Sequence, residues 1–130
     1  MSACIVGWAH TPFGKLDGET VESLIVRVAT GALADAGVSP ADVDEIVLGH
    51  FNAGFSPQDF TAALVLQASP DLRFKRATRV ENACATGSAA VHQGLNAIAA
   101  GSTNIAAAAS RVSKVPPMKR ALSANVGKSS

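Results

Sequence analysis

Cys84 is the side chain of this sequence best placed to act as a nucleophile. It follows a predicted strand at residues 77–82 and lies near the start of a predicted helix at 83–100, whose first residues are small (ACATGSAA). The first turn of a helix leaves backbone N–H groups unpaired and carries partial positive charge, which favours a thiolate over a thiol. The same N–H groups can hold the oxyanion that forms when a thioester carbonyl is attacked. The pattern therefore predicts a cysteine that accepts an acyl group, although a lone cysteine is also a common residue of apolar cores.

Three histidines are candidates for the base that would activate this thiol. His92 lies eight positions beyond Cys84, which on a helix is about 12 Å along the axis and too far for a direct hydrogen bond. His50 lies near the end of a predicted strand at residues 45–51. Because the carboxyl ends of parallel strands meet at one edge of a sheet, His50 is the local candidate. His10 follows the first predicted strand and is expected to be a turn residue.

Other polar residues near the predicted strand ends have both a functional and a structural interpretation. Asn52, in the triplet N-A-G, either lines the mouth of a site or only makes a turn. Glu81 and Asn82 either assist Cys84 or cap the following helix. A basic cluster has the charge to meet phosphates, but a solvated face or a subunit contact is the expectation for its members, Arg73, Lys75, Arg76 and Arg79.

The composition is that of a single globular domain. The chain has 130 residues, 48% of them hydrophobic and 16% charged, which argues against disorder. The net charge of +1 gives no reason to expect nucleic acid or an anionic membrane as a partner. Cys4 and Cys84 are far apart in sequence, so we expect a reducing, cytoplasmic setting without disulfides, and Cys4 in the core. Neither a signal peptide, a membrane span nor a metal-binding spacing is evident, which predicts a soluble protein without a metal.

Strands and helices are predicted to alternate along the chain. Thr20 is a plausible cap for the first helix, and Gly37 supplies its end. The order of elements predicts an α/β fold with a βαβαβα arrangement around a parallel sheet. The expected elements are strands at 3–9, 45–51 and 77–82, helices at 21–36, 60–68 and 83–100, and a capped turn at 39–42.

Residues 106–130 differ in character from residues 1–105. The first stretch holds six Lys or Arg against ten Asp or Glu, whereas the second holds five Lys or Arg and no acid. The second stretch opens with AAAAS, which is neither a typical strand nor a complete helix, and it contains two consecutive prolines. We therefore expect a folded unit at 1–105 and an atypical, irregular basic tail at 106–130 that is poorly ordered.

Several motifs resemble those of the thiolase family. The segment RVENACATGSAA resembles the thiolase nucleophile motif, which is close to V-E-x-x-C-A-S-G, with Thr86 where many members have serine. The run ACIVGWAHTPFGKL is similar to the family's opening strand and turn, and LADAGVSPADVDEIVLGHFNAG is similar to its first helix and second strand. The resemblance extends over residues 1–105 and implies an incomplete N-terminal half of a thiolase-like fold. The motif sequences resemble those of acetyl-CoA acetyltransferases and sterol-carrier-like thiolases more than those of ketoacyl synthases.

The resemblance implies that Cys84 is the catalytic nucleophile of an acyl-CoA acyltransferase of lipid metabolism. The cysteine would take an acyl group from acyl-CoA and pass it to the carbanion of a second acyl-CoA, or the reverse cleavage would run with free CoA. Acyl-CoA and CoA would be substrates, with no separate cofactor. Intact members of the family form homo-oligomers.

Some parts of the thiolase pattern are missing from this sequence. The family's other catalytic groups are a histidine, an asparagine and a second cysteine, and they lie in a C-terminal half that we do not find here. A valine-rich fourth strand is expected after Ile105, and AAAASRVSKV does not have that pattern. The alternative hypothesis is therefore a truncated, catalytically inactive remnant, or a fragment that depends on a partner.

Overall fold

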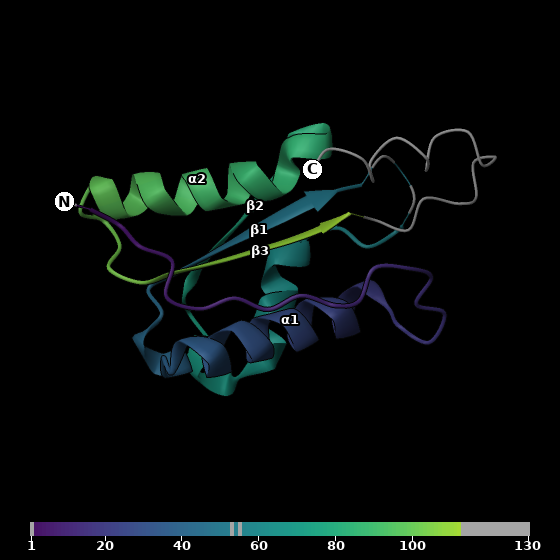
Figure 1. The fold of residues 1–130 in the computed structure, drawn as a ribbon, viewed down its shortest axis with the longest axis horizontal. Helices are drawn as coiled ribbons and strands as arrows, with labels where there is room; N and C mark the ends of the chain where they lie inside the picture. The colour runs from purple at the N-terminus through teal and green to yellow at the C-terminus, as the bar shows by residue number, and fades with distance from the viewer. Residues whose placement is uncertain (1, 53, 55, 113–130) are drawn as a thin grey trace, which may run out of the picture.

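The fold is a small parallel β-sheet with helices on both faces (Figure 1). The computed structural model describes residues 2–52, 54 and 56–112. Its strands are β1 (Glu45–Phe51), β2 (Arg76–Val80) and β3 (Ala106–Val112), in the order β2-β1-β3. Helix α1 (Val21–Ala36) covers one face of the sheet, and helix α2 (Thr86–Ala99) covers the other (Figure 1). The predicted α/β class and parallel sheet are confirmed.

Helix α1 begins and ends where the sequence predicts. The Thr20 hydroxyl accepts a hydrogen bond from the N–H of Ser23 at 3.0 Å, and the Ser23 hydroxyl accepts one from the N–H of Thr20 at 2.9 Å. These two bonds form a capping box, which satisfies N–H groups that a helix start leaves without partners. At the other end, Gly37 has a φ of 63°, a left-handed conformation that glycine adopts without steric cost.

Strand β1 is the centre of the sheet and of the core. It pairs in parallel with β2 on one edge and with β3 on the other. Ile46 and Leu48 are fully buried and belong to the main apolar cluster, together with Ile25, Val65 and Leu72. Val47 is also fully buried and, because strand side chains alternate, it faces the opposite side, where α2 lies.

Short 3-10 helices connect these elements in the described residues: η1 (Pro40–Asp42), η2 (Thr61–Ala68), η3 (Pro70–Leu72) and η4 (Ala83–Ala85). The capped turn predicted at 39–42 is confirmed as η1. The segment predicted as a helix at 60–68 is the 3-10 helix η2, and the helix predicted at 83–100 is divided into η4 and α2. In the part of the chain that the structure describes, no helix is long and apolar enough to cross a membrane.

The predicted first strand, at residues 3–9, does not form. Both edges of β1 are already occupied by β2 and β3, so the segment has no place beside the central strand. It lies against α1 instead, where a Cβ on Gly7 would be only 2.5 Å from the Cβ of Ala36. The backbone N–H of Trp8 donates a hydrogen bond of 2.9 Å to the Asp35 carboxylate. Glycine is required at residue 7 because any side chain would separate the segment from the helix.

Strand β3 corrects the expectation that irregular structure begins at residue 106. It pairs with β1 at the edge of the sheet, and its small alanines let α2 come close, since a Cβ on Gly94 of α2 would be 3.3 Å from the Cβ of Ala106. The carboxylate of Asp44 accepts hydrogen bonds from the N–H groups of Asn104 and Ile105, at 2.8 and 3.1 Å, and so fixes the start of the strand. The rest of the predicted tail, residues 113–130, lies outside the described residues, and the division of the chain at residue 105 stays a prediction.

Candidate active site at Cys84

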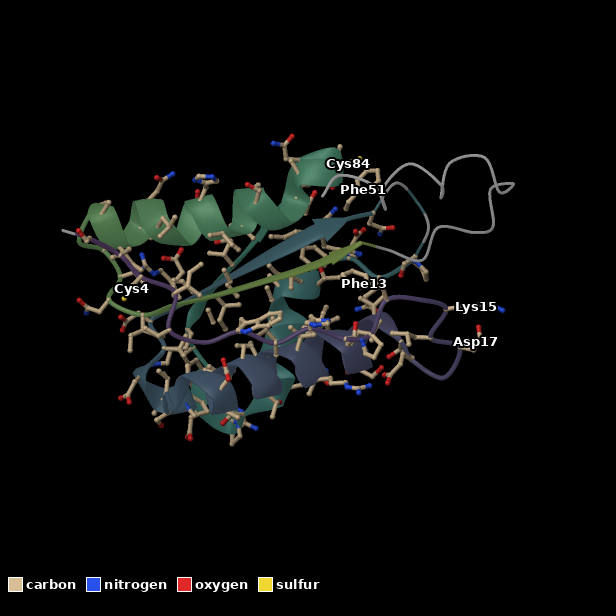
Figure 2. All side chains as sticks on the ribbon, in the orientation of Figure 1. Cys4, Phe13, Lys15, Asp17, Phe51 and Cys84 are labelled. Carbon is tan, nitrogen blue, oxygen red and sulfur yellow. The ribbon has the colours of Figure 1, made fainter. Side chains whose placement is uncertain are left out.

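Cys84 lies in the turn that connects β2 to α2. It is the middle residue of η4, two positions before α2 begins at Thr86. Its thiol is exposed and forms no disulfide. Figure 2 shows Cys84 at the same end of the sheet as Phe51, the last residue of β1. The predicted position of Cys84 near a helix start is confirmed, with the correction that a single 3-10 turn precedes the α-helix.

The turn around Cys84 is closed by one buried side chain. The Thr86 hydroxyl accepts a hydrogen bond of 2.9 Å from the N–H of Asn82 and donates one of 2.7 Å to the carbonyl of Ala83. Only 1% of Thr86 is exposed. A further bond of 2.8 Å joins the N–H of Ala85 to the carbonyl of Asn82. Sequence reasoning noted Thr86 only as a departure from serine, although its spacing of four from Asn82 was visible.

Ala83, directly before the cysteine, has an unusual backbone conformation. Its φ is 42°, in the left-handed region that residues with a Cβ avoid. Strained residues of this kind persist only where the surrounding structure holds them. Neither η4 nor α2 has a hydrogen bond from its N-cap side chain. The N–H groups of Ala85 and Thr86 donate instead to the backbone carbonyls of Asn82 and Ala83.

His50, the candidate base, is buried on the side of the sheet away from α2. Its side chain is fully buried. It lies two positions after Leu48 of the main cluster on the same strand, so the two side chains point to the same face of the sheet. Its Nδ1 lies 3.1 Å from the hydroxyl of Thr61 in η2. The imidazole is therefore directed toward η2, which weakens the hypothesis that it activates Cys84.

His92 has the position that the sequence suggested, whereas the strand that His10 was expected to follow does not form. His92 is exposed on α2. His10 is in the N-terminal segment, with its Nδ1 2.8 Å from the carbonyl of Thr11 and its ring stacked between Trp8 and Phe13, at centroid distances of 5.1 and 5.8 Å. Among the described residues, none makes a hydrogen bond with the Cys84 thiol.

Arg79 connects the segments that surround the candidate site. Its Nε donates to the carbonyl of His50 at 3.2 Å, and its guanidinium makes an ion pair with Glu81 at 2.7 Å and with Asp59 at 3.6 Å. Sequence reasoning missed this role, although Arg79 and Glu81 have the spacing of two that places strand residues on one face.

The basic cluster is largely engaged within the protein. Arg76 pairs with the buried carboxylate of Glu45 at 3.4 Å and donates to the Thr103 hydroxyl at 2.8 Å. Lys75 donates to the carbonyl of Ala41 at 2.8 Å. With Arg79 similarly occupied, the structural interpretation of this cluster is favoured over phosphate binding.

The remaining candidates have structural positions. The side chain of Asn52 accepts from the N–H of Ser56 at 3.0 Å and donates to its carbonyl at 2.8 Å, which closes a turn. Cys4 is exposed, so its expected place in the core is wrong, because the segment at 3–9 is not a strand of the sheet. Within the described residues, no group of three His, Cys, Asp or Glu side chains is arranged to hold a metal ion.

Comparison with known proteins adds to this geometry. The family model described as thiolase, N-terminal domain, matches residues 3–122. An acetyl-CoA acetyltransferase of Methanocaldococcus jannaschii is 36% identical over 102 residues, which cover 78% of this chain and 26% of that protein.

Solved structures show the same fold. The acetyl-CoA acetyltransferase from Syntrophomonas wolfei has a TM-score of 0.68 and 27% identity, over 78% of this chain and 26% of that one. The Acat5 thiolase from Ascaris suum, solved in complex with coenzyme A, has a TM-score of 0.60 and 18% identity, over 75% of this chain and 25% of that one. The present chain thus spans about a quarter of the length of these relatives. Because the family model covers residues 3–122 of 130, and the nucleophile motif lies within that match, the chain belongs to the thiolase family.

Proposed function

We propose that this chain carries the nucleophile of a thiolase-type acyl-CoA acyltransferase and that Cys84 is that nucleophile. The observation that carries the proposal is the exposed thiol in the tightly bonded turn between β2 and α2. The turn lies inside the thiolase match, and a relative at 36% identity is named an acetyl-CoA acetyltransferase. Acyl-CoA and CoA are the proposed substrates.

In the proposed first step, the Cys84 sulfur attacks the carbonyl carbon of acyl-CoA. A carbon–sulfur bond forms to Cys84, the bond to the CoA sulfur breaks, and the CoA thiolate leaves and is protonated. In the second step the acyl group passes to the α-carbanion of another acyl-CoA and the thiol is released, or, in the opposite direction, CoA thiolate takes the acyl group. The backbone N–H of Cys84 itself is the proposed donor to the oxyanion of each tetrahedral intermediate.

A second hypothesis is that the chain accepts an acyl group but does not complete the reaction. It is favoured by the observation that no described residue hydrogen-bonds to the Cys84 thiol and that His50 is directed toward η2. A general base must lie within hydrogen-bond reach of the proton that it removes. The two hypotheses predict the same acyl-cysteine and differ in turnover.

The test is to incubate the full 130-residue chain with acetyl-CoA and to locate the acetyl group by intact-mass and peptide mass spectrometry. We expect one acetyl group on Cys84 and none after Cys84→Ala. Cys4→Ser is the matched control, since Cys4 is the other exposed free thiol, and it should leave the modification unchanged. Acetylation of the Cys84→Ala variant to the wild-type extent would contradict the proposal. Turnover of acetoacetyl-CoA with CoA then separates an active acyltransferase from a fragment that only accepts the acyl group.

A further inference from the structure

The hydroxyl of Thr86 joins the residues on either side of Cys84. It accepts from the N–H of Asn82 and donates to the carbonyl of Ala83, while the backbone N–H of Thr86 is directed to the same carbonyl. Thr86 therefore bonds to the N–H of Asn82 and to the carbonyl of Ala83, the two residues directly before the cysteine. Because Thr86 is 1% exposed, water cannot readily replace these bonds if the hydroxyl is removed.

These bonds hold a backbone that would otherwise relax. Ala83 has a positive φ of 42°, which is unfavourable for a residue with a Cβ. Without the hydroxyl, the N–H of Asn82 loses its acceptor and the Ala83 carbonyl keeps only the backbone bond from residue 86, so Ala83 would be expected to return toward a conformation with negative φ. That rotation would move Cys84, the next residue, and change the direction of its sulfur relative to the N–H groups of α2.

We infer that Thr86 is a positioning residue for Cys84, which acts through the turn and not by touching the substrate. This inference rests on the proposed function and adds a second residue to it. The hydroxyl sets the conformation of Ala83, and the conformation of Ala83 sets where the thiol lies. The methyl group of Thr86 limits its rotamers, so serine should perform the same task less rigidly.

The experiment compares Thr86→Val, which keeps the shape of the side chain, with Thr86→Ser, which keeps the hydroxyl. Two rates are measured on the full chain: alkylation of Cys84 by iodoacetamide and acetyl transfer from acetyl-CoA. Cys4 in the same molecules is the internal reference for alkylation. We expect Thr86→Val to lower both rates at Cys84 by about tenfold or more, since small displacements of a reacting atom are costly. The alkylation rate at Cys4 should not change, and Thr86→Ser should stay within about threefold of the wild-type protein.

Equal rates for Thr86→Val and the wild-type protein would overturn the inference, as would a Thr86→Ser variant as slow as Thr86→Val. If Thr86→Val does not fold, the double variant Ala83→Gly/Thr86→Val replaces it, because glycine takes a positive φ without strain. Recovery of Cys84 alkylation in the double variant supports the inference, and failure to recover contradicts it. A wild-type chain that takes no acetyl group would instead count against the proposed function, while the alkylation rates would still test Thr86.

Discussion

Single residues fix the geometry around Cys84, and Arg79 connects three separate segments there. It hydrogen-bonds to the end of β1 at His50 and pairs with Glu81, on the path from β2 to the cysteine. Its third partner, Asp59, lies in the segment before η2. Since Glu81 and Asp59 are substantially exposed, the hydrogen bond to the backbone should contribute more than the ion pairs.

Replacement of Arg79 tests this role. We expect Arg79→Met, which keeps much of the side-chain volume, to lower the free energy of unfolding by about 1 kcal/mol. The reason is that the partly buried backbone carbonyl of His50 loses a charged donor. Urea unfolding followed by circular dichroism measures the change. Arg73→Met is the matched control and should have little effect, since the Arg73 side chain is exposed and has no hydrogen bond or ion pair with the described residues. Equal stability of the two variants would show that the Arg79 contacts are of no consequence.

At this scale the sequence predicted the position of Cys84 but not the contacts of the residues around it. The small residues after a strand were enough to place Cys84 beside a helix start. The hydroxyl of Thr86 could not be assigned, because a threonine in the first turn of a helix is common, and only its burial and its two bonds distinguish it. His50 was placed at the correct sheet edge, but its face depends on which side of β1 each helix covers.

Among the elements, the start of β3 depends on Asp44. The N–H groups of Asn104 and Ile105 donate to its carboxylate and hold the pKa of Asp44 below its ordinary value. Burial acts in the opposite direction, and the positive charge of Lys75 adds to the lowering. Because the folded pKa is depressed, the stabilisation is present above the unfolded pKa, about 3.9, and is lost as the pH falls through the folded value.

The measurement is urea unfolding between pH 7 and pH 2.5 for the wild-type protein and Asp44→Asn. Asparagine has the same size but does not titrate. We expect the wild-type protein to be the more stable of the two at pH 7 and the difference to shrink below about pH 4. A difference that is constant over this range would show that the Asp44 charge does not contribute.

The elements that the sequence predicted well carry local signals, and those it missed depend on pairing. Helix α1 has a capping box and a terminal glycine, and β1 is an apolar run between polar residues. The apolar run at 3–9 has the same appearance as a strand, yet it lies along α1, because strand order in a sheet is not encoded locally. β3 was missed because alanine has low strand propensity, whereas its place beside Gly94 requires small residues.

For the whole molecule, the N-terminal segment leaves apolar side chains in contact with solvent. Four of them are largely exposed: Ile5 at 75%, Val6 at 62%, Trp8 at 66% and Phe13 at 98%. Exposed apolar side chains gathered in one segment favour association, because burial of apolar surface is favourable by about 25 cal/mol per Å².

We therefore expect the chain to self-associate as its concentration increases. Sedimentation velocity should show a rise in mean mass with concentration for the wild-type protein and a smaller rise for Val6→Ser/Trp8→Ser. Phe74→Ser is the control, since Phe74 is fully exposed and lies far along the chain from this segment. A wild-type protein that stays monomeric throughout the range, or a control with the same effect as the double variant, would contradict the expectation.

The sheet order also has a consequence for how the chain acquires its structure. Among the described strands, the central strand β1 comes first in the sequence and its partner β3 comes last. The hydrogen bond from Ile105 to Asp44 spans 61 positions. The pairing of β1 with β3 therefore requires a large loop to close. Such long-range parallel pairing forms slowly compared with helices and hairpins. On a ribosome, β1 would be translated well before β3, and one of its hydrogen-bonding edges would stay open until residues 106–112 emerged.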